Sequence, residues 1–391
     1  MTHNFDEVID RRHTDSVKWD SIQETYNDED LLAMWVADMD FKAPPEVLNA
    51  LSKRIEHGVI GYNYHPQSLY SSIINWVKNR YGWEIKKEWI IFTPGVVAGF
   101  NFGLKALTKE SEDVIIQPPV YPPFTNVVDN IGRNFIKNPL VEEDGKYSMD
   151  FDGLETLLES SKLLLFCSPH NPVGRVWTKE ELDRLKELIV ENDAYIVSDE
   201  IHCDLAYKDK RHIMVASLSK EIEQRSITLI APSKTFNLAG LFTSVAIIPN
   251  DEIRDKVQKL MDDTSINHIN LFGLLALETA YSKGEQWLDD LLDYVESNAD
   301  LVVDYIESNI KDIKVNKPDG TFLMWLDCRK LELDHEDLHN LLIKEGKVLL
   351  NDGYTFGQEG DGYLRLNIGC PKETLEEGLR RIKKAVDSLS K

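Results

Sequence analysis

The chain has 391 residues, and its 44 basic against 67 acidic side chains give a formal net charge of −23. A hydrophobic share of 42% supports a large buried core and excludes disordered and fibrous classes, while the negative charge disfavours binding to nucleic acid or to an anionic membrane surface. The longest apolar runs are far shorter than the roughly 20 residues that cross a bilayer, so we expect no membrane-spanning segment.

Short apolar segments alternate with helical patterns between about residues 89 and 250. Each segment is too short for a helix and is bounded by polar or proline residues, which is typical of a buried strand. A helix with a capping box begins at Thr178, with Glu181 at its N3 position. Strands separated by such helices predict an α/β fold with a mostly parallel, doubly wound sheet. The predicted strands are 90–92, 114–116, 163–166, 195–197, 227–230 and 245–248.

The pattern changes after Asp251, where long helices extend to about residue 310. Strand-like segments follow at 321–326 and 363–366, with helices expected at 335–345 and 372–389. The first forty or so residues are polar and lack a core of their own, so we expect them to pack on this C-terminal part. We therefore predict a large α/β domain at 45–285 and a smaller α+β domain formed by 1–44 and 286–391.

Candidate functional residues follow the predicted strands, at the edge of the sheet where open α/β folds bind ligands. The turn at 93–99 contains Gly95 and leads into a helix, so its N–H groups either bind a phosphate or form an ordinary turn. The loop at 168–174 presents Asn171, whose amide can donate and accept hydrogen bonds, although turn chemistry alone also explains an Asn-Pro pair. Both segments leave a structural and a functional interpretation open.

Three charged residues in similar positions indicate chemistry more directly. Asp199 ends a buried strand, where a carboxylate needs a cation unless it caps a helix. Lys234 follows another strand among apolar neighbours, where a lowered pKa would make its amine a nucleophile that forms a Schiff base; otherwise it is a surface lysine. Arg365 alternates with apolar residues, so its guanidinium binds either a substrate carboxylate or a structural partner. We expect no metal site, because no metal-binding spacing accompanies Asp199 and His202.

Taken in this order, the segments resemble the fold-type I pyridoxal 5′-phosphate (PLP) enzymes of the aminotransferase class I and II type. The closest resemblance is to the MalY/PatB group of cystathionine β-lyases and cysteine desulfhydrases. It extends from Arg11 to Arg365 and is most specific at 35–41, 199–202 and 233–241.

The resemblance implies a role for each candidate residue. Lys234 would hold PLP as a Schiff base, Asp199 would pair with the pyridine nitrogen, and Asn171 would bind the phenolic oxygen. Arg365, with Asn171, would bind the substrate. The remaining implied cofactor contacts are Tyr121 on the ring face, His202 near the ring oxygen, the backbone of Val96 and Val97 with Ser233 at the phosphate, and Tyr62 at the phosphate of the neighbouring subunit.

One departure from the family bears on the reaction. Typical class I aminotransferases carry an arginine eight residues after the Schiff-base lysine, where it neutralises the cofactor phosphate, and this chain has Phe242 there. The difference favours the lyase group and leaves the counter-charge of the phosphate unassigned.

The resemblance implies a PLP-dependent lyase that cleaves L-cystathionine or related S-substituted cysteines by α,β-elimination. Lys234 would act as the base, and Tyr121 or Tyr62 would donate a proton to the leaving thiolate. The alternatives are transamination on the same cofactor and a regulator that works by binding a protein partner. A homodimer with shared sites is implied. We also expect a cytoplasmic location, because no secretory signal is visible and the four cysteines form no CxxC pair.

Overall fold

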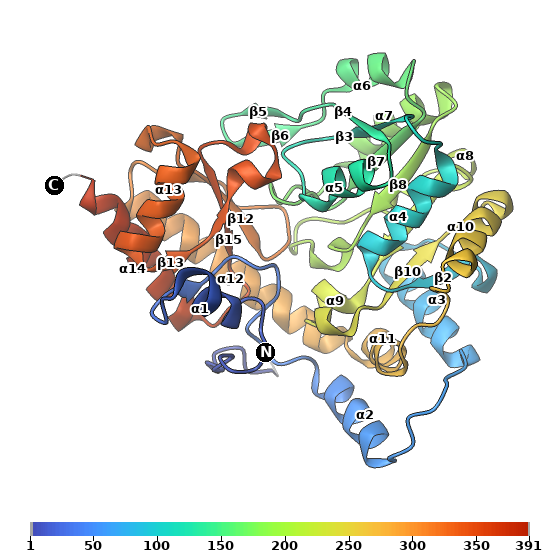
Figure 1. Ribbon diagram of the computed structural model, residues 1–391, viewed down its shortest axis with the longest axis horizontal. Helices are drawn as coiled ribbons and strands as arrows, with labels where there is room; N and C mark the ends of the chain where they lie inside the picture. Colours follow the sequence, from blue (N-terminus) through green and yellow to red (C-terminus); the bar gives the residue numbers. More distant parts are fainter. Residues whose placement is uncertain (1–2, 390–391) are drawn as a thin grey trace.

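A seven-stranded sheet forms the centre of the computed structural model, which describes residues 3–389 (Figure 1). All its strands run parallel except β10, which is antiparallel to both of its neighbours. The six strands predicted between residues 89 and 250 are all present, so the predicted mostly parallel α/β class is confirmed. In spatial order the strands are β2 (Ile90–Thr93), β10 (Ser244–Ile247), β9 (Ser226–Ile230), β8 (Tyr195–Asp199), β7 (Leu163–Cys167), β3 (Asp113–Ile116) and β4 (Asn134–Lys137).

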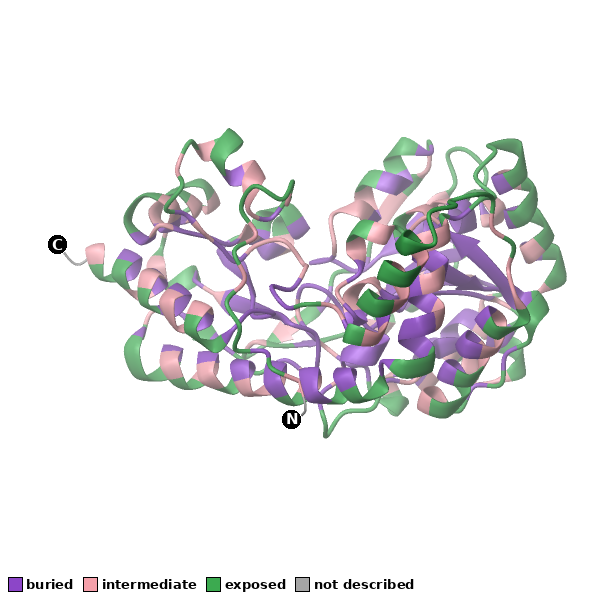
Figure 2. Ribbon diagram, turned by 90° about the horizontal axis from the view of Figure 1, so that it is seen from below, coloured by how far each residue is buried: buried purple, intermediate pink, exposed green. Residues whose placement is uncertain are grey.

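Helices cover both faces of this sheet, as a doubly wound fold requires. Alternate residues of β7 enter different cores: Leu163 and Leu165 pack on one side, and Leu164 and Phe166 on the other. Because both faces are covered, the inner strands are largely apolar, and β7 is apolar along its whole length. Figure 2 shows the sheet buried between helices with exposed outer faces. One face is packed by α4 (Val96–Leu107), α5 (Pro123–Asn130) and α10 (Asp251–Asp263), the other by α6 (Phe151–Leu158) and α7 (Lys179–Glu191).

The predicted capping box is present at the start of α7. The Thr178 hydroxyl accepts a hydrogen bond from the backbone N–H of Glu181 at 3.2 Å, and the Glu181 carboxylate accepts one from the backbone N–H of Thr178 at 2.8 Å. The two bonds satisfy N–H groups that have no partner within the helix.

A second, antiparallel sheet lies in the C-terminal part of the chain. It contains the two strands predicted at 321–326 and 363–366, which the structure places at β12 and β15. The helix expected at 335–345 is α13 (His335–Leu341) followed by a π-helical turn (Leu342–Gly346). In spatial order the sheet is β11 (Lys314–Val315), β12 (Leu323–Asp327), β15 (Tyr363–Asn367) and β14 (Asn351–Asp352), flanked by α12 (Glu285–Asn309) and α14 (Lys372–Ser388).

The two ends of the chain are joined by backbone pairing. Strand β1 (Leu32–Ala33) runs parallel to β13 (Val348–Leu349), and Ile22 of α1 (Asp20–Tyr26) packs in the same small cluster as Leu349. The N-terminal segment therefore contacts the C-terminal part, as expected. The domain boundaries at 45–285, 1–44 and 286–391 stay a prediction.

A helix and a long connection project from the body (Figure 1). These are α2 (Pro45–Glu56) and residues 57–66, which lead into α3 (Gln67–Tyr81). None of the described helices is long and apolar enough to cross a membrane. The remaining elements are the hairpin β5 (Val141–Glu143) and β6 (Lys146–Ser148) and the helices α8 (Lys220–Glu223), α9 (Pro232–Thr235) and α11 (Leu271–Lys283).

The capping box makes a prediction about stability. Thr178→Ala removes the acceptor for the Glu181 N–H and should lower the free energy of unfolding by about 1 kcal/mol, measured by urea unfolding. The matched control is Thr156→Ala, since the exposed Thr156 hydroxyl lies within α6 and donates to the Asp152 carbonyl at 3.1 Å. A loss as large in the control as in Thr178→Ala would refute the capping role.

Candidate functional site

One cavity gathers the segments that follow strands β2, β7, β8 and β9 at their carboxyl ends. These are the four places in the large sheet where the sequence predicts functional residues, and the sheet topology brings them together. The cavity is lined by Ala37, Pro94, Gly95, Val96, Val97, Tyr121, Cys167, Asn171, Asp199, Ile201, His202, Ser233, Lys234, Ala239, Phe242 and Thr243.

The Lys234 amine lies at the end of α9, inside this cavity. Its Nζ donates a hydrogen bond to the backbone carbonyl of Ala37 at 2.6 Å. Burial, followed by the positive charge of Arg365, lowers the Lys234 pKa to about 8, against the opposing effect of two carboxylates, Asp38 and Asp199. Near neutral pH a useful fraction of the amine is therefore unprotonated, as a nucleophile or base requires.

Asp199 ends β8 with its side chain almost fully buried. One carboxylate oxygen accepts a hydrogen bond from the Ile201 N–H at 3.1 Å. Asp199 caps none of the described helices, so the helix-cap alternative does not hold. Burial raises the Asp199 pKa to about 7. This carboxyl group is therefore suited to a positively charged ligand atom that would ionise it.

Arg365 lies on β15 and is 4% exposed. Its guanidinium donates to the Asn171 side-chain oxygen and to the Trp35 carbonyl, both at 3.0 Å, and to the Asn351 side chain. Within residues 3–389 it forms no ion pair, and its Nε has no hydrogen-bond partner. The alternative of a structural ion pair therefore does not hold, and a buried cation is left that a carboxylate ligand could neutralise.

Tyr121 and His202 lie on the same cavity. Burial and the charge of Asp199 raise the Tyr121 pKa, so its phenol keeps its proton at neutral pH. Burial, with the positive charges of Lys234 and Arg365, lowers the His202 pKa to about 3, so its imidazole is neutral. Its Nδ1 is buried without a hydrogen-bond partner in the described part of the chain.

The N-terminus of α4 faces the cavity through Gly95, Val96 and Val97. Gly95 has a φ of +101°, which favours glycine, and turns the chain so that the free N–H groups of the first helical turn lie at the cavity wall. Such groups bind anions, and Ser233 lies beside them. Lys234 is the one lysine or arginine among the described lining residues, and Phe242 is 68% exposed.

Tyr62 does not join the cavity of its own chain. It lies in the projecting connection between α2 and α3, and its side chain is fully exposed. A role at a site would therefore require a second chain.

Several lining residues were not among those predicted from the sequence, among them Ala37, Cys167 and Thr243. Residues 35–41 stand out in the sequence as a specific segment, but Ala37 acts through its backbone carbonyl, which no side-chain pattern can indicate. Asn351, which holds Arg365, carries no signal in the sequence.

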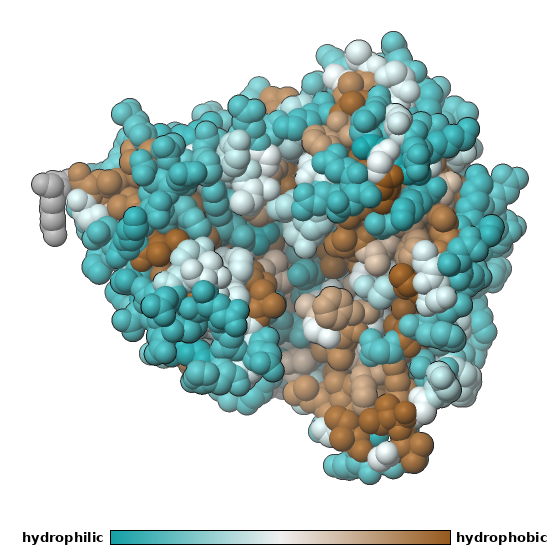
Figure 3. All heavy atoms as spheres, viewed as in Figure 1, coloured by the Kyte–Doolittle hydropathy of each residue, from teal (hydrophilic) through white to brown (hydrophobic). Residues whose placement is uncertain are grey.

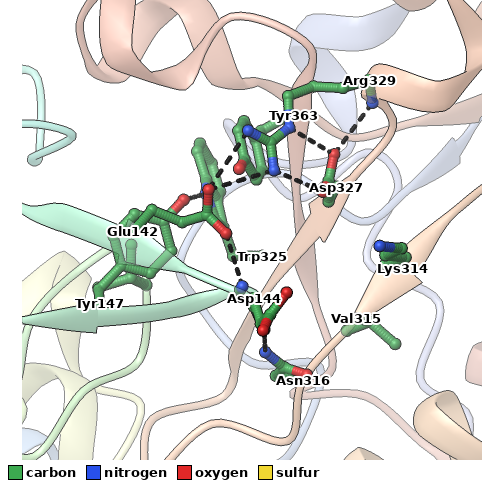
Figure 4. Close-up of a pocket in the computed structure, with 12 residues that line it drawn as sticks. Glu142, Asp144, Tyr147, Lys314, Val315, Asn316, Trp325, Asp327, Arg329 and Tyr363 are labelled. Carbon is green, nitrogen blue, oxygen red and sulfur yellow. Dashed lines mark hydrogen bonds and ion pairs between the residues drawn. The ribbon is translucent and has the colours of Figure 1, made fainter.

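A second cavity lies between the β5–β6 hairpin and the C-terminal sheet (Figure 4). Arg329, the arginine that lines this cavity, forms ion pairs with Asp327 at 2.8 Å and with Glu142 at 3.3 Å. The Trp325 and Tyr363 rings stack at 5.1 Å. The groups here bind one another, so we interpret this cavity as a junction between hairpin and sheet. Residues 3–389 contain no cluster of side chains suited to a metal ion.

Comparison with known proteins agrees with this geometry. The family profile described as aminotransferase class I and II matches residues 29–382. Cystathionine beta-lyase PatB of Bacillus subtilis (strain 168) is 43% identical over 385 residues, which cover 98% of this chain and 100% of that protein.

Two solved structures show the same fold. Cystalysin of Treponema denticola, whose crystal contains a pyridoxal 5′-phosphate cofactor, has a TM-score of 0.97 at 37% identity and covers 100% of both chains. The PLP-bound C–S lyase of Staphylococcus hominis has a TM-score of 0.91 at 33% identity and covers 99% of this chain and 98% of its own.

The cavity residues fit PLP, which presents an aldehyde, a pyridine nitrogen and a phosphate. The chain supplies an amine at Lys234, a buried carboxyl group at Asp199 and helix N–H groups at Val96 and Val97. The buried His202 Nδ1 that lacks a partner also leaves room for a polar ligand atom.

The raised Asp199 pKa predicts a change of stability with pH in the cofactor-free protein. The folded state binds this proton up to about pH 7, whereas an unfolded aspartate loses it near pH 4. Stability therefore falls as pH rises from about 4 to about 7. Asp199→Asn removes this loss, so its unfolding free energy relative to the wild type should rise by roughly 1–4 kcal/mol from pH 5 to pH 8.

Urea unfolding at the two pH values measures this difference. The control is Asp209→Asn, an exposed aspartate, whose difference from the wild type should be equal at both pH values. If the difference in unfolding free energy between Asp199→Asn and the wild type were also equal at pH 5 and pH 8, Asp199 would be ionised throughout this range.

Proposed function

The chain belongs to the aminotransferase class I and II family, and on this premise we propose that it is a PLP-dependent carbon–sulfur lyase. Its reaction is α,β-elimination of L-cystathionine and related S-substituted cysteines to pyruvate, ammonia and a thiol. The observation that carries this proposal is one cavity in which Lys234, with its lowered pKa, lies with Asp199 and next to the unpaired Arg365.

Each cavity residue has a partner on the cofactor. Lys234 would bind it covalently, Asp199 would pair with the pyridine nitrogen, and Asn171 would donate to the phenolic oxygen, since the Asn171 side-chain oxygen is taken by Arg365. When bound, PLP supplies an electron sink that stabilises negative charge at the substrate Cα. The remaining contacts are Tyr121 at the ring face, His202 near the ring oxygen, and Ser233 with the N–H groups of Val96 and Val97 at the phosphate.

Arg365 binds the substrate α-carboxylate in this proposal. Its side chain is fixed by Asn171, by Asn351 and by the Trp35 carbonyl, so the planar guanidinium is oriented before substrate arrives. An oriented guanidinium can form two parallel hydrogen bonds to a carboxylate. This contact sets where the substrate Cα lies.

Lys234 then removes the Cα proton. With a pKa of about 8 its amine is available as a base near neutral pH. The Ala37 carbonyl accepts one N–H of this amine and so restricts where its lone pair points.

The leaving thiolate needs a proton, and Tyr121 is suited to donate it. Burial beside Asp199 raises its pKa, so the phenol is protonated under working conditions. Tyr62 of a second chain is the other candidate for this role.

Transamination is the second candidate function, because it begins with removal of the same Cα proton and the family includes aminotransferases. Phe242, in place of the arginine of typical class I aminotransferases, favours elimination.

We also propose a homodimer with shared sites. Exposed apolar side chains gather on α2 and the connection after it, including Leu48, Ile55, Val59 and Ile60, and Figure 3 shows this hydrophobic surface. Phe242 is exposed at the cavity, which a second copy would cover. A two-fold arrangement brings Tyr62 to the cofactor phosphate of the partner. A cytoplasmic location also stays part of the proposal, supported by four buried, free cysteines.

The lyase proposal predicts two losses of activity, measured as pyruvate and thiol released from L-cystathionine. Lys234→Ala should lower kcat by at least about 100-fold, because the base is lost. Arg365→Lys should lower kcat/KM by about 10- to 100-fold, because a lysine cannot form paired hydrogen bonds to the carboxylate.

The control is Lys208→Ala, an exposed lysine whose loss should leave the rates unchanged. Glutamate formed from 2-oxoglutarate and an amino acid, in place of pyruvate and thiol, would establish transamination instead.

Shared sites predict complementation between inactive variants. In a mixed dimer of Lys234→Ala and Tyr62→Ala chains, one site has both native residues and the other has neither. Random exchange of subunits makes half of the dimers mixed, so about a quarter of wild-type activity should return. No recovery in a mixture shown by mass spectrometry to contain mixed dimers would exclude a shared site.

A further inference from the structure

Residues 35–41, which we call the strap, contact both positive groups of the site through their backbone. The Ala37 carbonyl accepts from the Lys234 amine at 2.6 Å, and the Trp35 carbonyl accepts from Arg365 at 3.0 Å. The position of the strap therefore determines where both side chains are held. Nothing in the proposed reaction accounts for how the strap itself is fixed.

Two asparagines hold the strap on its inner side. Asn237, three residues after Lys234, accepts from the Met39 N–H at 3.0 Å and donates to the Met39 and Phe41 carbonyls at 2.8 Å. Asn367, two residues after Arg365, donates to the Val36 carbonyl at 2.5 Å and the Asp38 carbonyl at 2.6 Å. The strap is thus tied to the segments that carry the two positive groups.

Two cations from the N-terminal segment hold the strap through its acidic side chains. Arg11 binds the Asp38 carboxylate at 2.8 Å and that of Asp40 at 2.7 Å. Lys18 binds Asp40 at 2.7 Å, and Trp19 donates to the same carboxylate at 3.0 Å. These contacts give a role to Arg11, Lys18 and Trp19, which the proposed reaction does not use.

The ion pair of Lys18 and Asp40 is buried rather than exposed at the surface. The Lys18 side chain is 1% exposed and that of Asp40 is 5% exposed. Burying an ion pair costs desolvation energy that apolar residues of similar size would avoid. Asp38 follows Ala37, whose backbone carbonyl contacts the Lys234 amine. A buried ion-pair cluster at this place is suited to fixing the position of that carbonyl.

We propose that Arg11 and Lys18 are positioning residues, which hold the Ala37 carbonyl against the Lys234 amine through Asp38 and Asp40. The proposal rests on the role of Lys234 in the proposed function. Arg11 has a second effect in this arrangement, because it neutralises Asp38, the strap carboxylate whose charge acts on Lys234.

The charged and titratable groups around Lys234 determine the direction in which each substitution should shift its pKa. Asp38 on the strap and Asp199 on β8 raise its pKa, Arg365 on β15 lowers it, and neutral His202 lies nearby. Removing the charge of Asp38 should therefore lower the Lys234 pKa. Removing Arg11, the cation closest to Asp38, takes away a positive charge and leaves the Asp38 carboxylate less neutralised, which should raise it.

The test measures the pKa of the Lys234 amine in the full-length protein after removal of the cofactor. Its rate of acetylation is followed against pH by peptide mass spectrometry, relative to exposed lysines of the same chain. Arg11→Gln should shift the midpoint upward and Asp38→Asn downward, each by about 0.5–1 pH unit. Arg11→Lys, which keeps the charge, should restore most of the wild-type midpoint.

Arg12→Gln is the matched control, since Arg12 is exposed and contacts the Glu29 carbonyl and the Trp19 ring rather than the strap carboxylates. Unchanged midpoints in Arg11→Gln and Asp38→Asn, shifts in the same direction, or an equal shift in Arg12→Gln would overturn the proposal. Because this readout uses no substrate, it is independent of whether the protein is a lyase.

Removal of Lys18 alone takes one of its two cations from the buried Asp40 carboxylate and could prevent folding. The double variant Lys18→Met, Asp40→Asn avoids this. Its Lys234 midpoint should shift downward, because a loosened strap no longer holds the Ala37 carbonyl as an acceptor for the ammonium form of Lys234. A folded double variant with the wild-type midpoint would exclude a positioning role for Lys18.

Discussion

Two positive groups lie close together, Lys234 in the cavity and the buried Arg365 beside it, and the rest of the site is arranged around this constraint. Within the described residues, neither Lys234 nor Arg365 forms an ion pair, and the charge of Arg365 lowers the pKa of Lys234. Buried cations without a counter-charge are costly in a protein alone. The anionic groups of the proposed ligands, a phosphate and a carboxylate, would supply what the chain lacks.

The parallel sheet makes this concentration of charge possible. Its strands end on one edge, so segments separated by up to about 140 residues in sequence, such as those of Gly95 and Lys234, meet at one cavity. The antiparallel C-terminal sheet adds Arg365 from a different core. Neither sheet holds all the groups, and Asn171 links the two through its bond to Arg365.

Much of the fold could be predicted from the sequence, because buried strands such as β7 are continuous apolar runs. The strands that prediction missed give no such signal. Strand β4 has exposed ends, the hairpin β5–β6 has only three residues in each strand, and β1, β11, β13 and β14 have two each. Their positions depend on contacts with distant segments. The same limit applied to the site: charged side chains could be recognised at strand ends, but the Ala37 carbonyl could not.

The hydrogen bonds of Asn367 imply an order of assembly during synthesis. This residue, far along the chain from the strap, holds the Val36 and Asp38 carbonyls, while the Gly369 carbonyl accepts from the Asp40 N–H at 2.8 Å. The strap therefore leaves the ribosome before Asn367 and Gly369, and it lacks these partners until the long intervening chain has followed. The large sheet can form before then, whereas the cavity is completed only when β15 has docked. A chain that stops short of this strand keeps the Asn237, Arg11 and Lys18 contacts but lacks Arg365 and the Asn367 bonds that hold the strap from the other side.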